Sequence, residues 1–546
     1  MCAGPTVQAW EARCIRELMD FAGARPDLLI IPDGPAEGTS GLRRIQRKRI
    51  LHQAYWEVLR PRAFRAVHLA DQLGDVPSIR CRVTTRGKFS QYFAGEDLRR
   101  IRDRELDFIL RFAFGIVRGD ILTAARYGVW SFHHDDELRY RGGPPCFWEI
   151  YRADPVTGAI LQRLTNRLDG GIVLRRGYFR TALHSLRQNI DTVHFGAARW
   201  PALVCRDIRA NLAAYIHDPP SRTTAPVFHA PDNGQMIRFA ATVAGSAARR
   251  IGGAMARHEQ WCLGVVDRPI SAFLEPDGHP RIRWFRPPQN GRFVADPFGV
   301  VRDGSVQILY EDFRYRTAKG VIASVPADAS ALPPRPNVAL ALAVHASYPY
   351  LVVDRGDVYC IPETHEAREV ALYRAIEFPS KWERVATLFE DVEALDTTVF
   401  RHDGRWWMTH TDQAEGKDLN LFVWHASDLR GPWIPHARNP VKTDVRSSRP
   451  AGTPFVHHGD LYRPAQDCSR TYGGAISMNR VEALSPTEFR EEVVLTILPS
   501  PRGPCPDGLH TISAVGDLTL VDGKRNRFTP SAIPYVLRGE ESGRSG

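Results

Sequence analysis

The chain lacks several features that define common protein classes. No apolar run approaches the roughly 18 residues needed to span a bilayer, and the first residues lack the basic and then apolar pattern of a signal peptide. The nine cysteines include no Cys-x-x-Cys pair, which argues against a zinc site and against a disulfide framework. We therefore expect a soluble, cytoplasmic protein with reduced, buried thiols.

The sequence also lacks a segment in which charges of one sign are concentrated. The 72 basic residues exceed the 62 acidic ones and give a net charge of +10, but lysine is scarce and no long basic block occurs. Nucleic acid is therefore not an expected partner, and scattered arginines suit phosphate recognition better. No Gly-x-x-x-x-Gly-Lys sequence occurs, so a phosphate loop of that type is excluded.

What is present divides the 546 residues into three predicted parts. They are an α/β domain at 1–215, a linker and helix at 216–260, and a region of short strands and Gly or Pro turns at 261–546. Helical spacing begins at Val7, whereas a doubly wound domain normally begins with a strand. The first strand is therefore expected to be missing, through truncation or a late start codon.

The first part contains a histidine and an aspartate in a catalytic pattern. His133 ends the apolar strand 127–132, and Asp169 opens a Gly turn 36 residues later. An open α/β sheet could bring both to the carboxyl ends of its strands, where an imidazole beside a carboxylate is a general-base arrangement. Ser131 shares a strand face with His133. His133-His134-Asp135-Asp136 is interpreted as a solvated loop, and no metal site is predicted.

These segments resemble the N-terminal domain of folate-dependent formyltransferases, such as methionyl-tRNA and sugar N-formyltransferases. Their Asn-x-His and Tyr-Arg-Gly motifs fall on Ser131 to His133 and on Tyr140 to Gly142, with serine in place of the asparagine. The resemblance implies a doubly wound fold and formyl transfer from 10-formyltetrahydrofolate to an amine. Ser131, His133 and Asp169 would be catalytic. The implied cofactor contacts are Phe112, Phe114, Tyr140, Arg141 and Gly142.

The last part contains a repeat of a strand, a Gly turn and a strand. Copies begin at residues 296, 348, 396 and 453, with a weaker copy at 510. A period of about 50 residues is typical of β-propeller blades, so we predict a five-bladed propeller.

Polar side chains near the blade starts and strand ends are candidates for the propeller channel. Clustered carboxylates provide the acid and the base that glycoside cleavage needs. Tyr348 and the pair Trp406-Trp407 could stack on sugars. Alternatively, the aspartates only cap strands and the tryptophans alternate between core and surface. The predicted channel residues are Asp296, Glu311, Tyr348, Glu363, Asp396, Arg463 and Asp467.

Two further resemblances support the prediction of a propeller with a polar channel. Ala295-Asp296-Pro297 is similar to the blade start of arabinanase-like glycosidases, in which the Asp is the general base. Ile361-Pro362-Glu363 and Arg463-Pro464-Ala465-Gln466-Asp467 look like the propeller region of plant glucosamine inositolphosphorylceramide transferases.

Three functional hypotheses follow. The first is formyl transfer to the amine of an amino sugar or sugar-containing precursor held partly by the propeller. The second is a glycan-active, glycosidase-like propeller with a degenerate formyltransferase domain. The third is a carbohydrate-binding or scaffold protein with neither activity.

Overall fold

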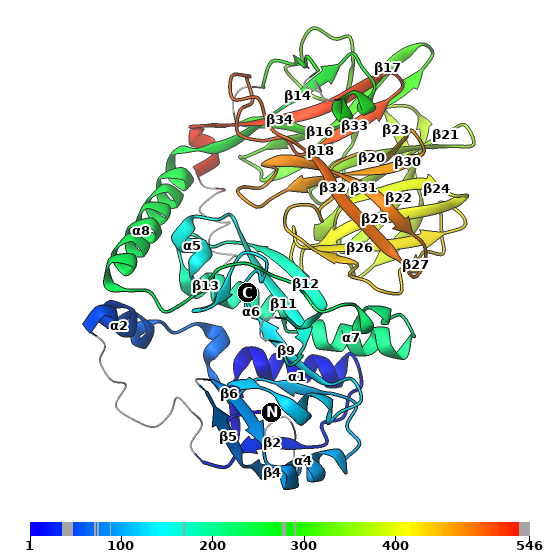
Figure 1. Ribbon diagram of the computed structural model, residues 1–546. Helices are drawn as coiled ribbons and strands as arrows, with labels where there is room; N and C mark the ends of the chain where they lie inside the picture. Colours follow the sequence, from blue (N-terminus) through cyan, green and yellow to red (C-terminus); the bar gives the residue numbers. More distant parts are fainter. Residues whose placement is uncertain are drawn as a thin grey trace. The chain divides into compact units, whose positions relative to one another are not determined.

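The computed structural model divides the chain into two compact units, Met1–Ala247 and Ala248–Gly546 (Figure 1). Each unit has its own sheets and its own apolar cores. No helix among those described is long and apolar enough to cross a bilayer. The structure describes residues 1–34, 47–69, 73, 76–87, 89–167, 170–275, 280–288, 291–533 and 535.

The N-terminal unit is built on a four-stranded mixed sheet with the order β12-β11-β9-β7. Strand β7 runs parallel to β9, whereas β11 is antiparallel to β9 and to β12. Val129 and Trp130 of β9 are both buried, as expected for a strand covered on two faces. The strands are β7 (Ile109–Arg111), β9 (Val129–His133), β11 (Val156–Arg163) and β12 (Ile172–Arg180).

Four small sheets complete the strands of this unit. They pair β1 (Thr6–Gln8) with β3 (Ala66–His68), β2 (Leu29–Pro32) with β4 (Ser78–Cys81), and β10 (Arg141–Gly142) with β13 (Val227–Phe228), and they join β5 (Val83–Arg86), β6 (Ser90–Phe93) and β8 (Ile116–Val117).

The predicted continuous doubly wound sheet is not seen among the described residues, because the sheet is interrupted between β2 and β7. Met1 and Cys2 lie in this gap: the Met1 ammonium donates to the Leu110 carbonyl at 2.8 Å, and the Cys2 N–H donates to the Ile30 carbonyl at 3.1 Å. A cavity of about 860 Å³ adjoins the gap and is lined by residues that include Leu28–Ile30 and Leu106–Leu110.

The helices have local signals at several of their starts. The helix α1 begins with a capping box between Gln8 and Glu11, and α6 begins where the Ser185 side chain accepts the Gln188 N–H. The helices are α1 (Ala9–Asp20), α2 (Ile50–Val58), α4 (Gly95–Arg102), α5 (Trp148–Arg152), α6 (Leu186–Ala197), α7 (Trp200–Arg209) and α8 (Asn233–Ala256). Short 3-10 helices are η1 (Arg47–Arg49), η2 (Arg62–Phe64), η3 (Gly119–Thr123), η4 (Ala214–His217), η5 (Ile270–Leu274), η6 (His365–Ala367) and η7 (Pro530–Ala532).

The segment 218–232, predicted as part of a linker, contains the short strand β13, is otherwise irregular and is bonded to the N-terminal unit. The Ser221 N–H donates to the Gly171 carbonyl at 2.8 Å, and the Thr223 hydroxyl donates to the Glu137 carbonyl at 2.7 Å.

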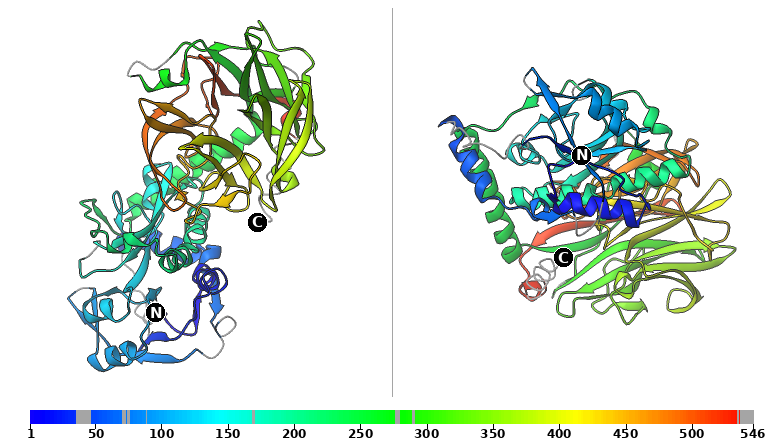
Figure 2. Two further views of the ribbon diagram at one scale, coloured as in Figure 1. Left: turned by 90° about the vertical axis from the view of Figure 1, so that its right-hand side faces the viewer. Right: turned by 90° about the horizontal axis from the view of Figure 1, so that it is seen from below.

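The second unit contains five antiparallel sheets of four strands, one of which carries an additional short strand (Figures 1 and 2). This arrangement is propeller-like and agrees with the repeat in the sequence. The first three sheets each follow the chain order. They begin with β16 (Arg292–Arg302), β20 (Ser347–Asp354) and β24 (Ala394–His402), and they end with β19, β23 and β27; β28 pairs with the third. Their other strands are β17 (Ser305–Arg314), β18 (Lys319–Pro326), β19 (Asn337–Leu340), β21 (Asp357–Glu363), β22 (Glu369–Glu377), β23 (Lys381–Glu390), β25 (Arg405–Asp412), β26 (Asn420–Ala426), β27 (Ile434–Pro435) and β28 (Lys442–Thr443).

The fourth and fifth sheets differ in how the chain builds them. The fourth is sequential, whereas the fifth joins β33 and β34 to β14 and β15 from the start of the unit. A disulfide between Cys262 and Cys505 links these two parts of the chain, so the prediction that all thiols are reduced is wrong for this pair. The strands are β29 (Phe455–His457), β30 (Asp460–Asp467), β31 (Ala475–Leu484), β32 (Phe489–Ile497), β33 (Ile512–Val515), β34 (Leu518–Arg527), β14 (His258–Val266) and β15 (Arg283–Trp284).

Candidate functional site

Three sheets of the second unit begin with the same backbone irregularity. In β16, β20 and β24 the register with the next strand shifts near the start of the strand. Asp296, Tyr348 and Asp396 lie at these bulges with φ angles of 54°, 42° and 52°, a region that residues other than glycine rarely occupy. Bulges re-aim side chains, and here they bring all three into one buried polar network.

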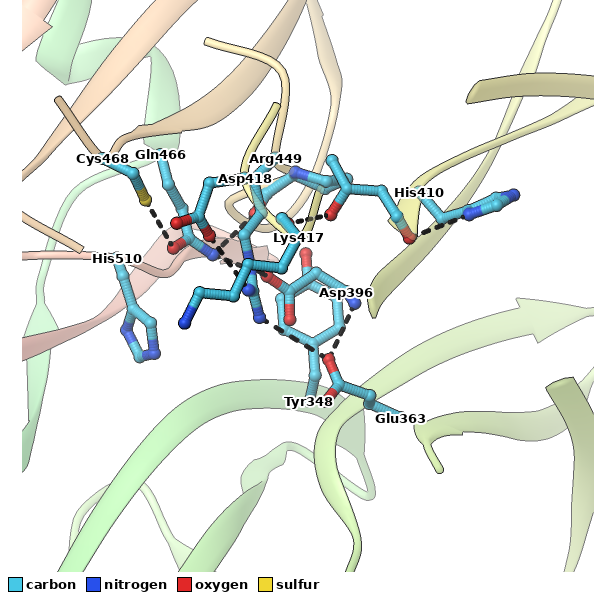
Figure 3. A network of polar contacts seen from close by, with 12 residues as sticks. Tyr348, Glu363, Asp396, His410, Lys417, Asp418, Arg449, Gln466, Cys468 and His510 are labelled. Carbon is cyan, nitrogen blue, oxygen red and sulfur yellow. Dashed lines mark hydrogen bonds and ion pairs between the residues drawn. The ribbon is translucent and has the colours of Figure 1, made fainter. Parts of the chain in front are cut away.

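The centre of this network is the carboxyl group of Asp396, which is 3% exposed (Figure 3). Its Oδ2 accepts hydrogen bonds from the Arg449 Nε at 2.5 Å and from the Gln466 Nε2 at 2.6 Å. The Asp396 N–H donates to the Glu363 Oε2 at 2.9 Å. The Glu363 carboxylate is therefore bound to the backbone of Asp396, and Arg449 lies against both carboxyl groups.

Arg449 connects the carboxyl groups. Its Nη1 lies 3.2 Å from the Asp418 Oδ1, its Nη2 lies 3.8 Å from the Glu363 Oε2, and its guanidinium lies 5.0 Å from the centre of the Tyr472 ring. Burial disfavours the charged guanidinium, but Asp396 and its other anionic neighbours outweigh that effect and raise the pKa of Arg449. The guanidinium is therefore a fixed positive charge in a buried anionic site.

The two neighbouring carboxyl groups titrate in opposite directions. Burial raises the pKa of Asp396 to about 8, although Arg449 opposes the shift. Burial acts on Glu363 in the same way, but the hydrogen bond from His365 and the charge of Arg449 outweigh it, so the pKa of Glu363 lies well below its ordinary value. The two carboxyl groups are therefore shifted apart, and such a separation suits acid chemistry at one group beside a negative charge on the other.

Asp296 is held by a separate set of donors. Its Oδ1 accepts the Thr511 hydroxyl at 2.7 Å, and its Oδ2 accepts the Tyr348 N–H at 3.3 Å. The His510 Nε2 lies 3.4 Å from the Asp296 Oδ1, and the His510 Nδ1 lies 2.6 Å from the Asp522 Oδ2. Burial raises the pKa of Asp296 despite the charge of His510.

The same residues have the spacing of a metal site. Donor atoms of Asp296, His510 and Asp522 all lie within 4.8 Å of one another. Burial would lower the pKa of His510, but Asp522 and Asp296 outweigh it and raise the pKa to about 9. His510 lies against both carboxyl groups, so the three residues form a buried ion-paired triad.

The other predicted channel residues divide into two groups. Glu311 adjoins the network: burial raises its pKa well above the ordinary value, nearby Asp296 and Glu363 add to the shift, and the His345 Nε2 lies 3.5 Å away. Arg463 instead pairs with Glu491 at 2.6 Å.

Three other side chains also lie outside the network. Asp467 accepts the Ser469 N–H at 2.9 Å. Trp406 and Trp407 are buried in two apolar cores of the sheets, so sugar stacking by this pair is wrong.

Sequence reasoning missed several members of the network. Arg449 and Gln466 are the donors to Asp396, and Asp418 completes the contacts of Arg449. Gln466 lies in the quoted Arg-Pro-Ala-Gln-Asp motif, where strand alternation separates it from Asp467. Arg449 lies in a loop, and no local signal identifies it.

In the N-terminal unit, Ser131 and His133 lie on β9 as predicted, but their neighbours differ from the expectation. The Ser131 hydroxyl is buried and accepts the Arg111 Nε at 3.1 Å and Nη2 at 2.8 Å. The His133 Nε2 lies 3.3 Å from the Tyr140 carbonyl oxygen. Asp169 lies outside the described residues.

The residues after His133 do not form the predicted solvated loop. His134 is buried and stacks on His194 with 3.7 Å between ring centres. Asp135 is also buried, and its Oδ1 accepts the Cys146 N–H at 2.8 Å.

The residues predicted to contact the cofactor each contact neighbouring residues of the protein. The Tyr140 hydroxyl donates to Asp154, and Arg141 donates to the Ala225 carbonyl at 3.0 Å. Gly142 has a φ of 92°, and a Cβ there would collide with the Phe228 carbonyl. The Phe112 ring lies 5.5 Å from that of Trp10, and the Phe114 ring lies 5.3 Å from that of Phe93.

Comparison with known proteins relates the second unit to a plant family. The family model "glucosamine inositolphosphorylceramide transferase 1, N-terminal" matches residues 286–504. The chain is 32% identical to glucosamine inositolphosphorylceramide transferase 1 of Oryza sativa subsp. japonica over 225 residues, which are 40% of this chain and 30% of that protein. The chain therefore spans less than a third of this relative.

Two further likenesses are more limited. The chain is 34% identical to a methionyl-tRNA formyltransferase of Prochlorococcus marinus over 76 residues, which are 14% of this chain and 22% of that protein. A solved structure of the GH130 family of mannoside phosphorylases and glycoside hydrolases is 11% identical, with a TM-score of 0.32, and the match covers 43% of this chain and 84% of that one.

Proposed function

We propose that the second unit binds a glycan or a sugar-containing precursor and acts on its glycosidic linkage at the network around Asp396. The observation that carries the proposal is a pair of carboxyl groups that face the same guanidinium and are shifted in opposite directions, Asp396 with a pKa raised to about 8 and Glu363 with a pKa well below its ordinary value. The match to a family of sugar transferases supports a carbohydrate substrate.

The roles follow from the charges. The raised pKa of Asp396 suits donation of a proton to the leaving oxygen of a glycoside. Glu363 remains ionised and stabilises the positive charge that develops on the sugar ring. The raised pKa of Asp296 makes it a stronger base, which suits activation of a water molecule or an acceptor hydroxyl.

The test is turnover of a panel of methyl glycosides, including amino sugars, by the full chain, because their alkoxide leaving groups need a proton from the general acid. We expect Asp396→Asn to lower kcat by about 10²-fold or more, because general acid catalysis contributes about 10²–10⁴. Arg446→Gln is the matched control, since Arg446 lies near Arg449 in the chain but pairs with Asp444 at 2.7 Å, with 42% of its side chain exposed. Equal turnover by Asp396→Asn and the parent chain would reject the proposed acid.

A second candidate function, formyl transfer from 10-formyltetrahydrofolate, belongs to the N-terminal unit and is supported by the short formyltransferase likeness. In this proposal Ser131, His133 and Asp169 keep their predicted roles, and the guanidinium of Arg111 polarises the Ser131 hydroxyl. Titration with 5-formyltetrahydrofolate by calorimetry tests it. We expect saturable binding and, with an active amine acceptor, retained or higher activity in Ser131→Asn. Absence of folate binding would reject this second function without affecting the first.

A further inference from the structure

The helix α2 turns its aliphatic side outward. None of its side chains is buried, and Ile50, Leu51 and Val58 are 43%, 42% and 79% exposed. With 100° between successive residues, these three and Ala54, which is also exposed, lie on one side of the helix. A surface helix of a globular protein normally turns such a side toward the core.

Contacts beside the aliphatic side fix α2 to α8. The Tyr55 ring lies 5.7 Å from the Phe239 ring. The Asn233 Oδ1 accepts the Leu51 N–H at 3.1 Å, and the Asn233 Nδ2 donates to the Arg47 carbonyl at 2.9 Å. Because these contacts set the orientation of α2, its outward aliphatic side is a property of the folded unit.

The start of α8 also exposes an aliphatic side chain next to a basic one. Ile237, one turn after Asn233, is 64% exposed. Helix α8 contains no acidic residue, and Arg238 is exposed beside Ile237. The aliphatic side of α2, together with Ile237, Arg47 and Lys48, is called the α2 surface below.

The charge around α2 is positive. Residues 47–60 have a net charge of +3, because Arg47, Lys48, Arg49 and Arg60 face only Glu57 among acidic residues in this stretch. Arg47 and Lys48 are exposed directly before the helix. Basic residues next to an outward aliphatic side are the features of helices that lie in the interface of an anionic membrane.

We propose that the α2 surface docks on bilayers that contain anionic lipids. Ile50, Leu51 and Val58 would enter the boundary between headgroups and acyl chains, while Arg47 and Lys48 contact lipid phosphates. A second copy of the chain is a poorer occupant, because it would bring equal positive charges together. Nucleic acid would leave the aliphatic side without a partner.

The test is flotation of the full chain with vesicles of phosphatidylcholine alone or with roughly 30% phosphatidylglycerol. We expect binding only to the anionic vesicles, and weaker binding when salt rises from about 0.1 M to 0.5 M. Arg47→Gln with Lys48→Gln should weaken binding roughly 30-fold, since each charge contributes about fivefold. Leu51→Ser with Val58→Ser should weaken it at least about tenfold.

Two substitutions in the second unit serve as matched controls that should leave binding unchanged. They are Val353→Ser, at a side chain that is 58% exposed, and Arg430→Gln, at another exposed arginine. Absence of binding to anionic vesicles overturns the proposal. It is also overturned if Leu51→Ser with Val58→Ser binds as tightly as the parent chain, or if light scattering shows a dimer that this variant abolishes. Equal affinity of the parent chain and this variant for RNA, without vesicle binding, would assign the surface to nucleic acid instead.

Discussion

Replacing Arg449 by glutamine is the perturbation that most directly probes the buried network of the second unit. The guanidinium is the cation shared by Asp396, Asp418 and Glu363, at 2.5, 3.2 and 3.8 Å. Its removal leaves three buried carboxyl groups without their common counter-charge. Loss of one partner from a buried ion pair costs about 3–5 kcal/mol.

This cost should depend on pH in a defined direction. In the parent chain the depressed pKa of Glu363 contributes stability above its unfolded pKa, and that contribution is lost as pH falls through the folded value. Without Arg449 the folded pKa values of Glu363 and Asp396 rise, so the variant gains stability at low pH and loses it as pH rises. The difference between the two proteins should therefore be larger at pH 8 than at pH 5.

The assay is thermal unfolding of the full chain, followed by the transition of the second unit. At pH 8 we expect the midpoint of Arg449→Gln to fall by roughly 6–15 °C, and at pH 5 by clearly less. Arg490→Gln should change the midpoint little at either pH, because its pairs with Glu482 and Glu488 are largely exposed and such pairs contribute about 0–1 kcal/mol. A shift of the same size at both pH values, or no shift, would refute the assigned electrostatics.

Three other predictions concern the same unit. The pKa of His510, raised to about 9, gives stability that is present below its unfolded pKa of about 6.5 and is lost as pH rises through 9. Urea unfolding of His510→Gln should accordingly show a loss of about 3 kcal/mol at pH 6 and almost none above pH 9.5, and equal losses would contradict the ion pairs. Tyr348→Phe removes the hydroxyl that accepts the buried Gly452 N–H at 2.7 Å, so the free energy of unfolding should fall by about 1–3 kcal/mol, in contrast to the partly exposed Tyr462→Phe. Gly452→Ala, at φ 114° with its Cβ directed into the Ile512 carbonyl, should lower the free energy of unfolding by more than about 3 kcal/mol. The control Gly404→Ala, at φ 73° in open space, should lower it by about 1 kcal/mol. Similar losses for both variants would contradict the steric argument.

The sheets of the second unit were predictable because each consists mainly of local hairpins. The repeat starts at 296, 348 and 396 coincide with the residues whose backbone bulges into the network. The closure of the fifth sheet by β14 and β15 was not predictable, because it pairs segments from opposite ends of the unit. The disulfide between Cys262 and Cys505 spans 243 residues and lies beyond spacing rules for the same reason.

The candidate site was predictable only in its carboxylates. Asp296, Glu363 and Asp396 stand at repeat positions, whereas Arg449 and Gln466 reach Asp396 from 53 and 70 residues away. In the N-terminal unit the strand holding Ser131 and His133 was identified from its apolar pattern. The contact of Ser131 with Arg111 depends on the pairing of β7 with β9, which no local motif specifies.

The central claim, a glycan site at the Asp396 network, is tested most directly by glycan-array binding followed by calorimetry with the best ligand. The account predicts that the full chain binds at least one glycan, that Glu363→Gln weakens the affinity by about tenfold or more through loss of a charged partner, and that Arg446→Gln binds normally. Absence of any bound glycan, or an affinity that Glu363→Gln and Asp396→Asn both leave unchanged, would contradict it.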